Sequence, residues 1–124
     1  MISATDFGRI EEDALRLLEL LCREPSVSAE GRALDTAAAL VEELLVGAGF
    51  ETKQLRVGEA PAAVYGEQSG RGDFTLLLYN HYDVQPTDPL ELWDSPPSSP
   101  RFATASCSLA APPTTRVRLR CASR

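Results

Sequence analysis

The chain has 124 residues, which is enough for one domain, and its three cysteines lack the number and spacing of a disulfide framework. No apolar run reaches the roughly 18 residues that a membrane helix needs. The acidic N-terminus lacks the positive flank and apolar core of a secretion signal, so we expect a cytoplasmic protein with no membrane partner.

The charges are unevenly distributed. Residues 1–94 contain all 18 acids and seven bases, a net charge of −11, although the whole chain carries only −6. Residues 95–124 contain five arginines and no acid, a net charge of +5. This last part is rich in Ser, Pro, Ala and Thr and has neither a helical nor a strand period. We therefore treat it separately from the rest of the chain.

Two amphipathic helices are predicted in the first half. The first is capped by Thr5 or Asp6 and ends before Pro25, because the residue preceding a proline avoids the helical region. The second runs from about Arg32 to Val46, and glycines follow it. Their apolar stripes, which we expect to be core, are Phe7, Ile10, Ala14, Leu17, Leu18 and Leu21 in the first helix, and Leu34, Ala37, Ala38, Val41, Leu44 and Leu45 in the second.

Three strands are predicted after the helices. Phe50–Val57 has the pattern of a half-exposed strand, and a short strand at Ala62–Tyr65 leads into a polar turn at Gly66–Asp73. Phe74–Tyr79 is apolar with little alternation, which is typical of a central strand covered on both faces. The order of elements predicts an α/β domain with a mixed sheet.

His81 follows the end of the predicted central strand, where open α/β sheets place their ligands. Asp83, two residues further on, is close enough to hold one nitrogen of the imidazole and fix its tautomer, as a carboxylate beside a metal ligand does. From this spacing alone, an ordinary loop histidine that hydrogen-bonds to the backbone is the favoured interpretation.

The wider sequence resembles a known family. The run Leu76-Leu77-Leu78-Tyr79-Asn80-His81-Tyr82-Asp83-Val84-Gln85-Pro86 and the later Leu92-Trp93-Asp94-Ser95-Pro96-Pro97 are similar to dinuclear-zinc metallopeptidases. That family includes carnosine-type dipeptidases, carboxypeptidase G, acetylornithine deacetylase and succinyl-diaminopimelate desuccinylase. The helices and their loops, around Pro25–Ser28 and Gly49–Glu51, also look like the family. The resemblance covers about residues 8–97.

This resemblance implies hydrolysis of dipeptides or N-acyl amino acids with two zinc ions, in proteins that are often homodimers. His81 matches a zinc ligand, and Asp83 matches the catalytic-site carboxylate that orients it. The family's bridging aspartate, its Glu-Glu pair, its further acidic ligand and its distal histidine have no counterpart in this chain. Because a catalytic zinc needs about three protein ligands, we expect the chain alone to be inactive.

The resemblance also suggests an origin for the end of the chain. Codons permitted for Ala103–Val117, when read two bases later, spell Asp-Gly-Lys-Leu-Phe-Ala-Arg-Gly-Ala-Ala-Asp-Asp-Lys-Gly, which looks like the family's second metal motif. We therefore predict that residues 1–97 are the N-terminal part of a metallopeptidase catalytic domain, with two helices and about three strands. Residues 98–124 would be an out-of-frame, disordered tail.

Two alternatives to a zinc hydrolase stay open. The chain could be a non-catalytic remnant that exposes apolar strand edges. The arginines near the end could instead form a basic arm that binds an acidic partner or nucleic acid. Only one aromatic ring, that of Phe102, accompanies those arginines. The main prediction therefore includes no nucleic-acid partner.

Overall fold

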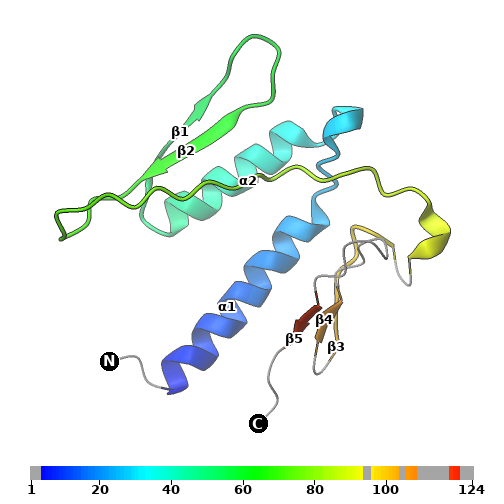
Figure 1. The fold of residues 1–124 in the computed structure, drawn as a ribbon, viewed down its shortest axis with the longest axis horizontal. Helices are drawn as coiled ribbons and strands as arrows, with labels where there is room; N and C mark the ends of the chain where they lie inside the picture. The colour runs from blue at the N-terminus through cyan, green and yellow to red at the C-terminus, as the bar shows by residue number, and fades with distance from the viewer. Residues whose placement is uncertain (1–3, 94–95, 104–105, 109–117, 121–124) are drawn as a thin grey trace. The chain divides into compact units, whose positions relative to one another are not determined.

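The computed structural model describes residues 4–93, 96–103, 106–108 and 118–120. The chain divides into two compact units, Ser26–Pro86 and a second that joins Met1–Pro25 to Thr87–Arg124. Figure 1 shows the elements of both units. None of the helices in the described ranges is long and apolar enough to cross a membrane.

The unit Ser26–Pro86 is built on helix α2, Leu34–Gly47, which begins two residues later than the sequence predicts. Ala33 stands at the N-cap with a left-handed backbone at φ 54°, and its carbonyl oxygen accepts a hydrogen bond from Thr36 Oγ1 at 2.9 Å. The 3-10 helix η1, Ser28–Glu30, precedes this turn and ends at Gly31, which is also left-handed. The backbone is therefore left-handed at two positions, Gly31 and Ala33, just before α2 begins.

A glycine ends α2 as the sequence predicts. Gly49 has a φ of 87°, a left-handed conformation that L side chains rarely adopt, and the N–H of Phe50 returns to the carbonyl of Leu45 at 3.0 Å. Gln68 Nε2 donates to the carbonyls of Ala48 and Gly49 at 3.4 and 3.3 Å. These bonds fix the end of the helix against the segment that follows the second strand.

An antiparallel hairpin packs on α2. Strands β1, Glu51–Leu55, and β2, Ala63–Glu67, pair from Glu51 opposite Glu67 to Leu55 opposite Ala63, so both predicted strands are present with shifted ends. Figure 1 shows the hairpin beside α2. A Cβ placed on Gly66 would lie 3.2 Å from Leu45 Cδ1 and 3.5 Å from Phe50 Cδ1. The small residue in β2 therefore allows the close approach of the helix.

The buried apolar side chains of the described residues all belong to this unit. They are Val27, Leu34, Ala37, Ala38 and Ala62. The predicted stripe of α2 is thus confirmed at its N-terminal end, while its C-terminal half is half-buried. Two helices and a two-stranded antiparallel sheet confirm the predicted α/β class.

The predicted central strand Phe74–Tyr79 is wrong for this structure. Residues 74–79 belong to no strand, and their side chains are exposed, Leu77 by 85%. A strand that is apolar on both faces needs neighbours on both edges and cover on both faces. The only sheet described within Ser26–Pro86 is β1–β2, and this segment does not join it. The mixed sheet is therefore absent from the described residues.

The second unit contains helix α1, Ala4–Arg23, which lies where the sequence predicts it. Its apolar stripe, however, does not form a core. Phe7 is 64% exposed and Ile10 is 54% exposed, while Leu17 and Leu21 are each just over a third exposed. The amphipathic pattern predicted the helix correctly, but a core also requires a partner surface, which periodicity does not report.

Within the second unit, the 3-10 helix η2 spans Leu90–Leu92. The described part of the predicted tail forms three short antiparallel strands in the order β3, β4, β5: Arg101–Ala103, Ser106–Ser108 and Arg118–Arg120. More than half of the tail, 98–124, lies outside the described residues, including Cys121 and most of the predicted out-of-frame motif.

Candidate functional site

The segment that carries the predicted site is fixed by the loop that precedes η1. Ser26 Oγ donates to the carbonyl of Tyr82 at 2.7 Å, and the Val84 N–H donates to the carbonyl of Ser26 at 2.9 Å. Ser28 N–H donates to the Val84 carbonyl at 3.4 Å, and Val27 forms a parallel bridge with Val84. Ser26 and Val27 are almost fully buried. Two segments more than 50 residues apart therefore hold each other in place.

His81 and Asp83 lie in contact. His81 Nδ1 is 2.9 Å from the carbonyl oxygen of Asp83 and 3.2 Å from its Oδ1, and the His81 backbone N–H donates to Asn80 Oδ1 at 2.9 Å. A proton on Nδ1 satisfies both oxygens and leaves the lone pair on Nε2. The histidine side chain is 73% exposed, so a ligand can reach that nitrogen from solvent.

Asp83 is held in its charged form by neighbouring donors. A hydrogen bond from the Ser28 side chain is the main cause that lowers the pKa of the Asp83 carboxyl below its usual value. Partial burial works in the opposite direction, while its own backbone N–H and the nearby His81 lower the pKa further. The carboxylate therefore stays ionised near neutral pH and can accept a hydrogen bond from a protonated Nδ1 of His81.

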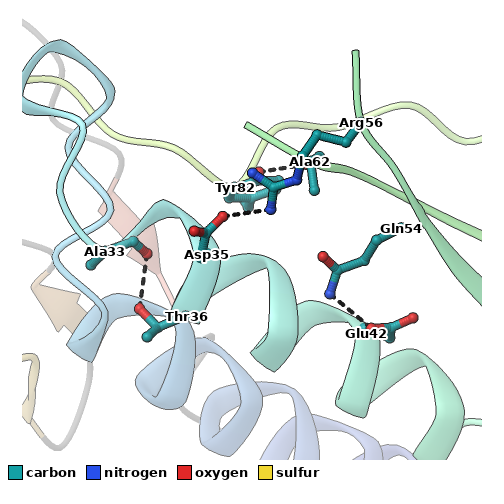
Figure 2. A network of polar contacts seen from close by, with 8 residues as sticks. All are labelled: Ala33, Asp35, Thr36, Glu42, Gln54, Arg56, Ala62 and Tyr82. Carbon is teal, nitrogen blue, oxygen red and sulfur yellow. Dashed lines mark hydrogen bonds and ion pairs between the residues drawn. The ribbon is translucent and has the colours of Figure 1, made fainter. Parts of the chain in front are cut away.

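Tyr82, between these two residues, contacts the loop that joins β1 to β2, beside an ion pair between that loop and α2. Its hydroxyl donates to the Ala62 carbonyl at 2.5 Å, and burial is the main cause that raises the pKa of the phenol. Arg56 Nη2 binds Asp35 Oδ1 at 2.7 Å beside it. Figure 2 shows the Arg56–Asp35 pair together with the hydrogen bond from Tyr82 to Ala62. The network fastens the site segment to the hairpin.

A second contact in Figure 2 joins α2 to β1 itself. Gln54 Nε2, in β1, donates to Glu42 Oε2, in α2, at 2.8 Å. With the Arg56–Asp35 pair, it gives the hairpin two polar attachments to the helix. These contacts are exposed, so each contributes modestly to stability.

The described residues do not make up a zinc site. No group of three His, Cys, Asp or Glu side chains among them is arranged to hold a metal ion. His81 is the one histidine of the sequence. A catalytic zinc takes about three protein ligands and leaves a position for water, so one oriented imidazole does not meet its requirements. The geometry supplies a single ligand position and no more.

The sequence pattern missed the residues that support this pair. The side chains of Ser26 and Tyr82 hold the segment, and the side chain of Ser28 stabilises the charge of Asp83, but the spacing of His81 and Asp83 indicates none of these contacts. Contacts between residues more than 50 positions apart produce no periodic pattern in the local sequence, so the sequence does not indicate them. The only available signal was the similarity of the loop Pro25–Ser28 to the same family as the histidine run.

Comparison with known proteins finds a likeness to a curated enzyme. Over 90 aligned residues, the chain is 39% identical to the succinyl-diaminopimelate desuccinylase of Leptothrix cholodnii. The alignment takes in 69% of this chain but only 23% of that protein, so the chain spans about a quarter of the relative's length. No family model and no solved structure matches the chain.

Proposed function

We propose that the chain is the N-terminal part of a zinc-dependent amidohydrolase of the desuccinylase type. The observation that carries the proposal is the 39% identity to the Leptothrix cholodnii enzyme. The substrate class would be dipeptides or N-acyl amino acids, whose amide bond lies next to a free carboxylate. The contact of His81 with Asp83, at the end of an apolar run, supports the same assignment.

Two residues have proposed roles. His81 would offer Nε2 to a zinc ion, and Asp83 would hold Nδ1–H so that the imidazole keeps that tautomer and orientation. Ser28 would keep Asp83 ionised for this purpose. A bound zinc ion supplies a water of lowered pKa to such reactions. The remaining ligands and the general base would have to come from sequence that this chain does not contain.

We further propose that the 124-residue chain has no hydrolase activity by itself. One histidine ligand cannot hold a catalytic zinc, and the described residues contain no other cluster that could. In this form the chain would be an inactive fragment of such an enzyme, and a non-catalytic remnant stays the alternative. The basic-arm alternative has no specific observation in its favour among the described residues.

The reading frame after Pro97 is the proposed cause of the missing ligands. Residues 95–124 lack acids altogether, and GC-rich Asp and Glu codons become Ala, Pro, Thr and Arg codons when the frame shifts. Sequencing the gene from the codon for Leu90 to beyond that for Arg124 tests this directly. A frame two bases later that stays open and encodes further acidic and histidine ligands is the expected result. Early stop codons in that frame would contradict the proposal.

The activity is tested by expressing the 124-residue chain beside a frame-restored chain, in which the frame is shifted by two bases after Pro97. Both are incubated with zinc and either an N-succinyl amino acid or a dipeptide. We expect turnover only from the frame-restored chain, and a loss of about 100-fold or more with His81→Ala. Turnover by the 124-residue chain above its own His81→Ala control would refute the proposed inactivity. An inactive frame-restored chain would refute the enzyme assignment.

A further inference from the structure

The segment Phe74–Tyr79, named here the unpaired segment, is the largest exposed apolar run of the described residues. Leu77 and Leu78 are 85% and 82% exposed, and Tyr79 is 93% exposed. Among the described residues, no backbone–backbone hydrogen bond involves 74–79. Figure 1 draws this part of the chain without a strand arrow. Among the described residues, its backbone groups therefore have no backbone partner, and its large apolar side chains are exposed.

The unpaired segment is apolar on both of the faces it would have as a strand. In extended backbone, successive side chains point to opposite faces, which places Leu76 and Leu78 on one face and Leu77 and Tyr79 on the other. A strand at the edge of a sheet, or one with a solvated face, normally carries polar residues at alternate positions. This composition suits a strand with neighbours on both edges and cover on both faces.

The end of the unpaired segment is already fixed in place. Three residues beyond its end, the stretch from Tyr82 to Val84 is hydrogen-bonded to the buried loop at Ser26 and Ser28, and the Tyr82 hydroxyl also donates to the Ala62 carbonyl. A partner therefore meets a segment that is anchored at one end. Such anchoring reduces the conformational entropy that is lost when the segment pairs.

We propose that the unpaired segment is a docking strand for the complementary part of a desuccinylase-like chain, meaning the sequence outside the 90 aligned residues. This inference rests on the proposed function. The matched relative has about four times the aligned length, since the alignment takes in 23% of it, so most of that protein lies in the complementary part. A second copy of this chain is a poorer occupant, because pairing two such segments satisfies only one edge of each.

The test is co-expression of the tagged 124-residue chain with the Leptothrix cholodnii desuccinylase from which the 90 aligned residues are deleted. We expect the two to co-purify in equal amounts. In the purified complex, the amides of residues 74–79 should exchange with deuterium about 100-fold more slowly than in the chain alone. A wild-type chain that purifies without the partner, or an unprotected segment within a complex, would overturn the proposal.

Matched variants distinguish docking at the unpaired segment from nonspecific hydrophobic association. Leu77→Asp and Leu78→Asp each place a charge on one face, and each should reduce complex formation about 100-fold or more because the carboxylate would be buried without a partner. Val57, in the loop between β1 and β2, is 84% exposed and apolar, so Val57→Asp is the control and should leave complex formation unchanged. Equal effects of all three variants would exclude the segment as the docking strand.

Three further outcomes are informative. If the chain alone sediments as a dimer and Leu77→Asp makes it monomeric, the occupant is a second copy and the proposal is wrong. A complex that forms but has no turnover supports the docking strand while contradicting the enzyme assignment. An active frame-restored chain whose separated parts do not associate contradicts the docking strand alone.

Discussion

At the scale of single residues, Ser28 links the buried loop to the charge of Asp83. Its hydroxyl is the main cause of the lowered pKa of the Asp83 carboxyl, ahead of the contribution of His81. Its backbone N–H also bonds the Val84 carbonyl, so the same residue positions the segment and stabilises the charge. The tautomer of His81 depends on that charge, since the ionised oxygen is the better acceptor for Nδ1–H.

Ser28→Ala is expected to raise the pKa of Asp83 toward its usual value, because the strongest donor to the carboxylate is lost. A lowered folded-state pKa gives stability that is present above the unfolded pKa and is lost as pH falls through the folded pKa. The variant should therefore have a smaller loss of stability on acidification. A carbon-13 titration of the Asp83 carboxyl checks this, with the exposed Ser99→Ala as control. An unchanged titration would show that Ser28 is not the cause.

Tyr82→Phe is expected to loosen the attachment of the site segment to the hairpin. It removes the hydroxyl that bonds the Ala62 carbonyl, and Ala62 is buried, so this acceptor loses its partner. The expected cost is about 1 kcal/mol, seen as a roughly fivefold loss of amide-exchange protection in β2. Tyr65→Phe is the control, because the Tyr65 hydroxyl bonds the exposed Glu67 side chain. Equal losses in both variants would contradict the assigned role.

At the scale of elements, the fit of the hairpin on α2 depends on Gly66. Gly66→Val should destabilise the unit by about 1–3 kcal/mol, because the added atoms meet Leu45 and Phe50. Valine favours strands over glycine, so any loss is steric rather than a matter of strand propensity. Gly70→Val is the matched control, since a Cβ there meets nothing within 4 Å. Amide-exchange protection of α2 measures both, and protection retained in Gly66→Val would show that the helix and hairpin can move apart.

The elements that sequence predicts well are those whose signals are local. Helix α1 begins beside the predicted caps and ends before Pro25, and α2 ends at the predicted glycines. The start of α2 differs because Ala33 adopts a left-handed conformation that alanine seldom takes, so no propensity predicts it. The unpaired segment differs for a larger reason. Its composition indicates a strand with neighbours on both edges and cover on both faces. The described residues do not provide those neighbours.

The same distinction applies to the candidate site. The spacing of His81 and Asp83 predicts a contact, and the structure contains one. Their metal-binding and orienting roles stay predictions. The support from Ser26, Ser28 and Tyr82 could not be predicted from spacing, because it depends on pairing between distant segments.

At the scale of the whole molecule, the expected behaviour toward zinc follows from the number of ligands. The affinity for zinc increases steeply with each protein ligand, and sites that stabilise a fold have four. The 124-residue chain offers one histidine, and its described residues hold no cluster of three donors. Its helix content and unfolding midpoint should therefore be the same with zinc and with a chelator.

The frame-restored chain should differ in this respect, with a zinc affinity at least about 100-fold greater than that of the 124-residue chain. His81→Ala should lower the affinity of the frame-restored chain, because it would remove one of several ligands acting together. In the 124-residue chain, His81→Ala should remove only the weak zinc binding of the single imidazole. Calorimetric titration with zinc, beside circular dichroism in chelator, measures both effects. Tight binding by the 124-residue chain that survives His81→Ala would place the ligands elsewhere, with the cysteines and acids as the first donors to replace.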